Sequence, residues 1–412
     1  MVAVSSDHMQ DTPSTGAATR APAVARARDP RLDFYRGIAM IIILFAHTPG
    51  NVFTQWIPAR WGFSDATEMF VFCSGMASAI AFGGTFARAG WPIGTARVAY
   101  RVWQVYWAHL GLFFVLAALL AAIDMTGVSD TVYIGTLNLW RFFSDPGPQL
   151  VGLFTLTYVP NYFDILPMYL VILILLPVVM ALARVNLWLL AACCVALWIF
   201  AQGALLERLG LGHLHLTLPA EPWSDRAWYF NPFGWQLVFF TGFAFMRGWI
   251  PAPPLTPLLI ALATIIVVAN IAVSNIGVRV FEFDWARDWR TANRGWFDKS
   301  DFGILRFVQF LALAYLGYAV AGDGGHRLIV TGTGVAARIA ATTIRLTTKI
   351  GQQSLAIFLV SMVLARIIGF VWDQIGRDLA TVVAGNLIGV AILIGAAYAV
   401  GWFKAHPWKV AK

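Results

Sequence analysis

Residues 31–50 read RLDFYRGIAMIIILFAHTPG, an apolar run from Ile38 to Ala46 bounded by Arg36 and His47. Apolar runs of about 20 residues recur from here to Phe403, and each is long enough to cross roughly 30 Å of hydrocarbon as a helix. The runs are continuous, whereas a membrane β-barrel requires alternating strands. The sequence therefore predicts an all-α polytopic membrane protein.

Ten spanning helices are predicted from these runs, at 34–53, 66–84, 102–123, 164–182, 187–206, 233–250, 255–275, 302–321, 351–372 and 381–403. The segments between them are too short for a separate soluble domain. Residues 31–412 are therefore predicted to form one transmembrane domain. Residues 1–30 are polar and lack the apolar core of a signal peptide, which predicts a disordered cytoplasmic tail.

Charge sets the expected orientation. Of the 412 residues, 59% are hydrophobic and 12% charged, about half the charged share of an ordinary soluble domain. If both termini lie on one side, that side carries 17 of the 29 Lys and Arg residues and the other side carries 10. The positive-inside rule then places both termini in the cytoplasm. The net charge of +8 follows from this topology, and no soluble basic module is available for binding nucleic acid.

Arg36 and His47 are eleven positions apart, within about 20° of three full helical turns, so both project from one face. They lie roughly 16 Å apart along the axis. With Arg36 at the cytoplasmic headgroups, His47 would lie near mid-membrane, where an ionisable group usually has a function. Pro49 should end or kink the helix just beyond it. His47 is thus the predicted general base, with a hydrogen-bonded core histidine as the alternative.

Two carboxylates open the next helix. Asp65 is expected at the outer mouth and Glu68 one turn deeper, near the depth of His47. A carboxylate beside an imidazole fixes its tautomer and stabilises its cation, so both residues are predicted to serve catalysis. A structural pairing of Glu68 with an arginine is the alternative.

The remaining polar residues suggest binding surfaces. Arg97 and Arg101, four apart at the cytoplasmic start of the third helix, share a face and could hold donor phosphates, although positive-inside flanking explains them equally well. Outer aromatic-rich segments suggest an acceptor site, for which the predicted residues are Asn161, Asp164, Arg287, Arg290 and Arg294. His109 is interpreted as a satisfied core histidine. His213 and His215 are placed in a loop, and no metal site is predicted.

Together these motifs resemble the acyltransferase-3 superfamily, most closely its OpgC-type branch, the succinyltransferases of osmoregulated periplasmic glucans. The basic residue and histidine of the first-helix signature are matched by Arg36 and His47. The acidic residue and Ser-Gly of the second are matched by Glu68 and Ser74-Gly75. The ninth-helix start, 350–355, is also similar, as are the Asp164–Pro167 and Asn231–Trp235 stretches. The spacing of the third-helix arginines is four where the superfamily usually has three, and Ser361 lies where many relatives carry a second histidine.

The resemblance implies an acyltransferase in the bacterial inner membrane. Its donor would be cytoplasmic acyl-CoA, succinyl-CoA in this branch, acting as co-substrate with no further cofactor. Its acceptor would be a hydroxyl of a periplasmic glucan. The donor-binding residues predicted on this basis are Arg36, Arg97, Arg101, Ser74, Lys349 and Gln353.

Several alternatives stay open at this level. A transporter or flippase of a glycan or lipid-linked sugar would also use membrane-embedded Arg, His and Glu, although the two matching halves of many carriers are not evident. Within the enzyme class, the acyl group could be acetyl. Direct transfer and an acyl-histidine intermediate are both compatible with His47. The oligomeric state is not defined, and a homodimer is one of the options.

Overall fold

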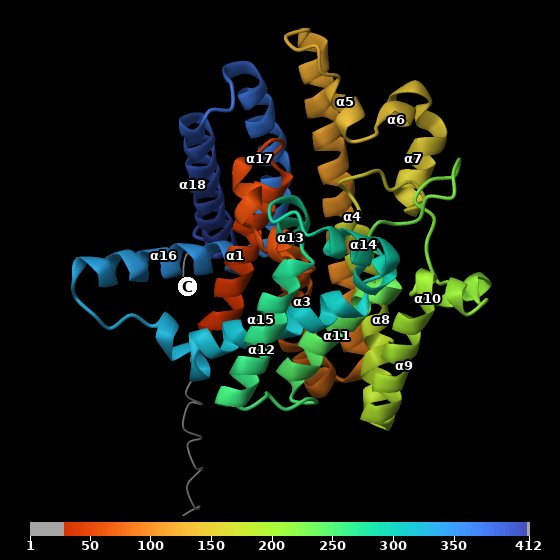
Figure 1. The fold of residues 1–412 in the computed structure, drawn as a ribbon, viewed down its shortest axis with the longest axis vertical. Helices are drawn as coiled ribbons and strands as arrows, with labels where there is room; N and C mark the ends of the chain where they lie inside the picture. Colours follow the sequence, from red (N-terminus) through yellow and green to blue (C-terminus); the bar gives the residue numbers. More distant parts are fainter. Residues whose placement is uncertain (1–28, 410–412) are drawn as a thin grey trace, which may run out of the picture.

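The computed structural model describes residues 29–409, and within that range the chain is helical, with a single isolated β-bridge between Pro219 and Ala227 and no strand. The disordered tail predicted for residues 1–30 lies almost entirely outside the described residues. Figure 1 shows a bundle whose helices run mostly along one direction, with several short helices at its upper and right-hand edges. The all-α fold class is thereby confirmed.

All ten ranges predicted to span the membrane contain a helix. These helices are α1 (Pro30–His47), α3 (Ala66–Ser78), α4 (Gly84–Thr126), α8 (Ile165–Val185), α9 (Leu187–Phe200), α11 (Pro232–Arg247), α12 (Pro257–Ala272), α15 (Ile304–Ala321), α17 (Ser354–Ile375) and α18 (Leu379–Lys404). By length and composition, six segments are suited to cross a membrane: Ala66–Met125, Ile165–Val185, Pro257–Arg279, Ile304–Ala321, Ser354–Ile375 and Leu379–Lys404. The first includes two of the predicted helices. The count of ten spans stays a prediction.

Short helices connect the long ones at the outer side of the predicted topology. They are α2 (Pro58–Trp61), α5 (Tyr133–Thr136), α6 (Trp140–Ser144), α7 (Pro146–Thr155), α10 (Gly203–Arg208), α13 (Asn275–Arg279) and α14 (Asp284–Ala292), with 3₁₀ turns η1 (Val52–Trp56), η3 (Gly212–Leu214) and η4 (Arg294–Phe297). A further 3₁₀ turn, η5 (Asp323–Leu328), follows α15.

Helix α1 ends just where Pro49 predicts, short of the residue 53 given for the predicted span. It begins under an Asp29 cap, whose side chain accepts a hydrogen bond from the Arg31 N–H, and its last helical residue is His47 rather than residue 53. Thr48 is already extended, and Pro49 can offer no N–H to continue the ladder. The early end leaves His47 at the carboxyl terminus of the helix.

Helix α4 starts well before the predicted residue 102. A π-helical turn, η2 (Ala79–Gly83), joins it to α3, and the backbone breaks again at Gly90, where φ is +77°. Glycine adopts this left-handed conformation without the penalty that a Cβ atom would impose. Pro92 follows at once, so the chain bends here before the long straight part of α4 begins.

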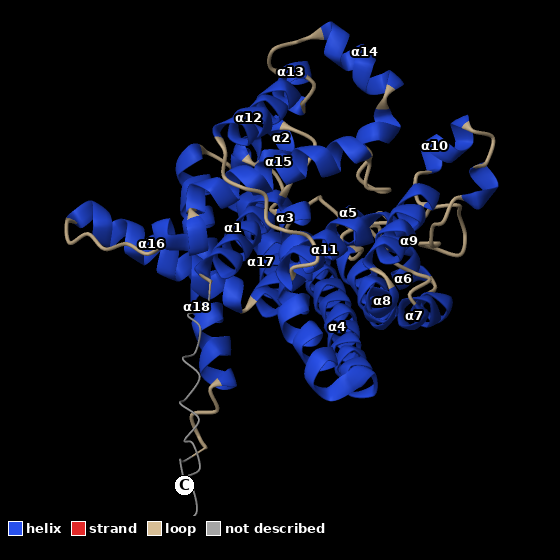
Figure 2. Cartoon of the chain, turned by 90° about the horizontal axis from the view of Figure 1, so that it is seen from below, coloured by secondary structure: helices blue, strands red, loops and turns tan. Residues whose placement is uncertain are grey.

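Besides the short connecting helices, one long helix was not predicted. Helix α16 (Val335–Gln352) extends sideways from the bundle in both views (Figures 1 and 2). Its exposed apolar residues, Val335 and Ile339, are interrupted by arginines and threonines, so it contains no continuous apolar run. Its other end crosses α1 so closely that there is no room for a side chain at Gly37. A Cβ atom on Gly37 would lie 1.9 Å from the Thr347 carbonyl oxygen. This crossing fixes α16 to the first helix.

The predicted orientation can be tested with two exposed positions, Asp288 in α14 and Thr342 in α16. In a background without the three native cysteines, Asp288→Cys is expected to react with a membrane-impermeant thiol reagent in cells with a permeabilised outer membrane. Thr342→Cys should react only after the inner membrane is also opened. The reverse order of labelling would invert the topology.

Candidate active site

His47 is held by its own helix. Its Nδ1 lies 2.8 Å from the carbonyl oxygen of Ile43, one turn back. A carbonyl oxygen can only accept, so Nδ1 carries the hydrogen and the lone pair of the neutral ring lies on Nε2. The ring is half-buried at the carboxyl end of α1, where the helix dipole favours a positive charge. His47 is therefore oriented as a base should be.

Tyr162 and Arg366 form the next layer around this ring. The Tyr162 ring meets His47 edge-on, with centroids 5.2 Å apart, and its hydroxyl donates to the Met362 carbonyl at 2.8 Å. The Arg366 guanidinium lies 4.3 Å from the centre of the Tyr162 ring. Tyr162 has a φ of +88°, an unusual value for a residue with a side chain, so its neighbours must hold it there.

The two predicted carboxylates belong to a buried charge network. Glu68 is fully buried; its Oε1 accepts a hydrogen bond from Arg306 Nε at 2.7 Å and lies 2.5 Å from Arg306 Nη2 in an ion pair. Its Oε2 accepts the Asp65 N–H at 2.8 Å, which completes a capping box at the start of α3. Asp65 in turn pairs with Lys299, the Nζ and Oδ2 atoms lying 2.5 Å apart.

This network corrects one expectation. Neither Asp65 nor Glu68 makes a hydrogen bond to the His47 ring in the described structure; the Ile43 carbonyl orients it instead. Lys299, Arg366 and Asp65 nonetheless lie close enough to interact electrostatically with His47. Burial alone would raise the pKa of Asp65, but Lys299 and Arg306 outweigh it and hold that pKa below its usual value. Asp65 is therefore ionised, and it balances the cations around the histidine.

Most of the predicted donor residues meet at the end of the bundle that the charge distribution predicts to be cytoplasmic. Lys404, at the end of α18, donates to Gln353 at 2.7 Å and lies within the electrostatic reach of Arg36 and Arg101. Arg36 also hydrogen-bonds Ser354. Lys349 belongs to the same group, since a Cβ atom on Gly401 would lie 2.7 Å from its Nζ and 3.7 Å from Gln353. The basic cluster is defined as Arg36, Arg101, Lys349, Gln353 and Lys404.

Two predicted donor residues lie apart from the contacts of this cluster. Arg97 donates to Thr85 at 2.5 Å, an intrachain contact across the bend in α4. Ser74 is a buried residue of α3. Lys404, by contrast, joins the cluster although the sequence suggested only a topological role. Lys404 follows an apolar run of more than 20 residues, and nothing in that run indicates which residues Lys404 contacts.

The three predicted acceptor arginines make different contacts. Arg287 makes an exposed ion pair with Asp284 at 3.0 Å. Arg290 donates to the Val273 carbonyl at 2.7 Å and lies over the Phe297 ring, so its hydrogen-bonding is largely internal. Arg294 lines a separate cavity. The shared role expected of the three arginines is not supported by this arrangement.

Asn161 and Asp164 flank, in the sequence, Tyr162, whose ring contacts His47. The Asn161 side chain accepts from Arg226 at 3.2 Å. Asp164 is buried and accepts the Tyr229 N–H at 3.2 Å. Burial raises the pKa of Asp164 to about 6, although Tyr229 and Arg226 act in the opposite direction.

A pH dependence of stability follows from Asp164. Its pKa is raised on folding, so the native state binds more protons than the unfolded chain, and stability falls as the pH rises from about 4 to about 6. The expected loss is about 3 kcal/mol, at 1.36 kcal/mol for each pKa unit. Asp164→Asn keeps the acceptor for Tyr229 and should lack this fall. Thermal unfolding of both proteins across the interval checks it; parallel curves would contradict it.

The other histidines are placed as follows. His109 is fully buried in α4, but neither ring nitrogen has a hydrogen-bond partner among residues 29–409, so the interpretation as a satisfied core histidine is wrong on that point. His213 lies in the 3₁₀ turn η3, and His215 follows it with Nε2 3.4 Å from Asp301. Within the described range, no three His, Cys, Asp or Glu side chains are grouped to hold a metal ion.

Comparison with known families decides the assignment. The model of the OpgC protein family matches residues 28–405, nearly the whole chain. The chain belongs to the OpgC family. OpgC membership identifies a membrane acyltransferase of glucan modification, and the match includes both His47 and the basic cluster. No curated protein and no solved structure matches the chain.

Proposed function

We propose that this OpgC-family protein transfers an acyl group, succinyl by its branch resemblance, from cytoplasmic acyl-CoA to a hydroxyl of a periplasmic glucan. The observation that carries the proposal is the orientation of His47. The bond from Nδ1 to Ile43 leaves Nε2 basic, at the opposite end of α1 from Arg36 and the basic cluster. One helix thus connects a site suited to phosphates with a site suited to proton transfer.

The donor would bind with its phosphates on the basic cluster and its thioester arm directed along α1. Guanidinium and ammonium groups bind phosphates through charge-assisted hydrogen bonds. The basic cluster contains four cations, which suits the several phosphates of CoA. The Gln353 side chain accepts from Lys404 and positions that ammonium group.

At the outer end of α1, His47 Nε2 would take the proton of the glucan hydroxyl while its oxygen attacks the thioester carbonyl carbon. The new C–O bond forms, the C–S bond breaks, and the CoA thiolate leaves with the proton returned by His47. The positive charges of Lys299 and Arg366, which reach this ring, would favour the negative charge that develops on the carbonyl oxygen.

The function is tested with purified protein in lipid vesicles, supplied with succinyl-CoA and a glucan. Succinyl transfer should appear as a mass increase of the glucan together with release of free CoA. A carrier would move glucan between compartments without consuming succinyl-CoA, and that result would overturn the proposal. Acetyl-CoA in place of succinyl-CoA distinguishes the two acyl groups.

The basic cluster gives a second test. Arg101→Gln combined with Lys404→Gln is expected to raise the KM for acyl-CoA at least tenfold, because each charge-assisted hydrogen bond contributes about 1.5–3 kcal/mol. The effect should lie in KM, since the phosphates are bound equally before and during the reaction.

Arg97→Gln is the matched control for that pair. It removes a cation from the same helix as Arg101, but its guanidinium is already bound to Thr85. The control should therefore change the KM for acyl-CoA less. If Arg97→Gln has the larger effect, the donor phosphates bind nearer the bend of α4 than proposed.

A further inference from the structure

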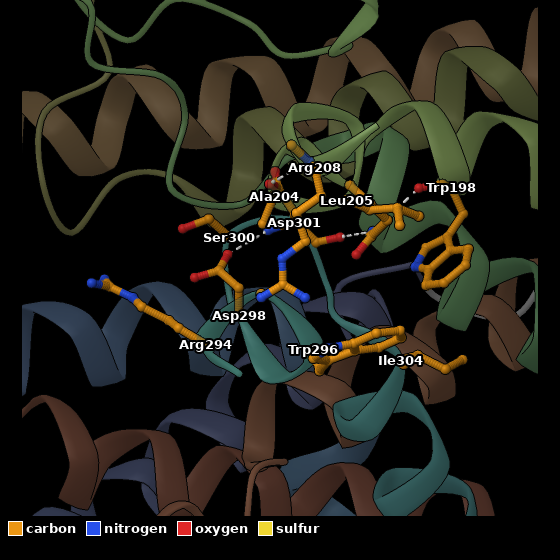
Figure 3. Close-up of a pocket in the computed structure, with 13 residues that line it drawn as sticks. Trp198, Ala204, Leu205, Arg208, Arg294, Trp296, Asp298, Ser300, Asp301 and Ile304 are labelled. Atoms are coloured by element: carbon orange, nitrogen blue, oxygen red, sulfur yellow. Dashed lines mark hydrogen bonds between the residues drawn. The ribbon is translucent and has the colours of Figure 1, made fainter. Parts of the chain in front are cut away.

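A cavity of about 390 Å³ lies outside the site described above, where the end of α9, helix α10 and the segment from η4 to α15 meet (Figure 3). Its volume is within the range of about 300–1,000 Å³ that is usual for small-molecule sites. The chemistry of its wall is set by two tryptophans, two arginines and a short polar loop: Trp198, Arg208, Arg294, Trp296, Asp298 and Ser300.

The tryptophans supply flat apolar surface. Trp296 is 44% exposed, so much of its ring is available to a ligand. The Trp198 indole N–H donates to the Phe302 carbonyl at 2.9 Å, which fixes the ring on the right-hand wall in Figure 3. A sugar ring has an apolar face of C–H groups, which packs well against rigid aromatic rings of this kind.

The polar groups of the wall carry both signs of charge. Arg208 extends between Asp298 and Trp296 in Figure 3, anchored by a bond to the Ala292 carbonyl at 3.0 Å. Asp298 accepts the Asp301 N–H at 3.0 Å. In the part of the chain that the structure describes, no ion pair joins Arg208 or Arg294 to Asp298, so these groups keep hydrogen-bonding capacity for a ligand.

This mixture favours a neutral ligand with hydroxyl groups. A hydroxyl donates to a carboxylate and accepts from a guanidinium, so neighbouring hydroxyls can satisfy both kinds of group. A phosphate or a lipid headgroup would meet the arginines well, but it would also meet the Asp298 carboxylate, and like charges repel. The cavity is therefore better matched to a sugar than to an anion.

The cavity adjoins, through one short loop, the transfer centre, which we define as His47 with the charged groups that act on it, Lys299, Arg366 and Asp65. Lys299 lies between Asp298 and Ser300, yet its ammonium pairs with Asp65 on the side whose charges reach His47. The loop is held firmly, since the Ser300 carbonyl accepts the Asn231 N–H at 3.0 Å. Its two neighbours face the cavity while Lys299 faces the transfer centre.

We propose that this cavity is a binding subsite for a sugar ring of the acceptor glucan, distinct from the ring that is acylated. The inference rests on the proposed function, because it takes the acceptor to be a glucan. A polymer can occupy the cavity with one ring and offer another to His47. The subsite would thus select long acceptors over short ones.

The test compares acceptors of increasing length. For Trp296→Ala, the ratio of kcat/KM for long glucose oligomers to kcat/KM for short ones should fall about tenfold, as expected for one lost stacking contact. Trp296→Phe, which keeps an aromatic ring, should restore much of the ratio. The matched control is Trp285→Ala, an exposed tryptophan of α14 that does not line the cavity. An unchanged ratio in Trp296→Ala, or an equal fall in the control, would overturn the subsite.

A binding measurement separates this proposal from the transfer reaction. Without acyl-CoA, a long glucose oligomer should change the tryptophan fluorescence of the wild-type protein, and Arg208→Gln should bind it more weakly. Oligomer binding without acyl transfer would contradict the acyltransferase function and support the subsite. Acyl transfer without a preference for long oligomers would support the acyltransferase function and contradict the subsite. Displacement of the oligomer by inorganic phosphate would show an anion site and overturn the sugar assignment.

Discussion

His47→Ala is expected to insert and fold, to bind acyl-CoA, and to transfer roughly 10²–10⁴-fold more slowly than the wild type, the usual contribution of a general base. The change removes the only group that α1 places at the transfer centre with a free basic nitrogen. The basic cluster lies at the opposite end of the helix, so donor affinity should be little altered. The measurement is glucan succinylation, normalised to the amount of protein in the membrane.

His47→Gln distinguishes catalysis from structure. Glutamine can donate the hydrogen bond to the Ile43 carbonyl, but its amide cannot take a proton. It should therefore restore stability without restoring transfer. His109→Gln provides the comparison, because His109 is buried in α4 away from these contacts. Near-normal transfer by His47→Gln would remove His47 from the mechanism.

Arg306→Gln is expected to destabilise the protein by about 3–5 kcal/mol, because it leaves Glu68 buried without its partner. Lys299 cannot replace the guanidinium, since it is already paired with Asp65. The start of α3 should loosen with it, as Glu68 also belongs to the capping box. Thermal unfolding in detergent and the amount of inserted protein would show the loss.

The double variant Glu68→Gln with Arg306→Gln is the control. Two neutral amides can hydrogen-bond each other and leave no buried charge, so most of the lost stability should return. If the two single changes instead add in the double variant, the pair does not act as a unit. Transfer measured on the recovered double variant then shows whether Glu68 has a catalytic role beyond the ion pair.

The long apolar helices could be predicted because each is encoded by a continuous run of residues. His47 could be placed at the end of α1 for the same local reason, since Pro49 stops the helix. Helix α16 was missed because its apolar residues are spaced among arginines and threonines, and its protrusion is a tertiary feature. The partners of a side chain were the least predictable part.

Two residues illustrate that limit. Glu68 was predicted at about the same membrane depth as His47. Its partner Arg306 is 238 residues away in sequence, so residue spacing could not reveal the ion pair. Tyr162 is similar: its ring reaches His47 only because the backbone there adopts a φ of +88° and its hydroxyl finds the Met362 carbonyl. Such contacts depend on how helices pack, which a single sequence does not encode in any short pattern.

The close crossing of α1 and α16 fixes the position of the first helix along its axis. A Cβ atom on Gly37 would meet Thr347, and one on Gly351 would lie 1.8 Å from the Asp33 carbonyl oxygen, so α1 has no room to slide along its axis. Eleven residues of helix then set the span between Arg36 and His47 at roughly 16 Å. A thioester whose flexible arm is shorter than this span would be anchored at one end and out of reach at the other, whatever its affinity for the basic cluster.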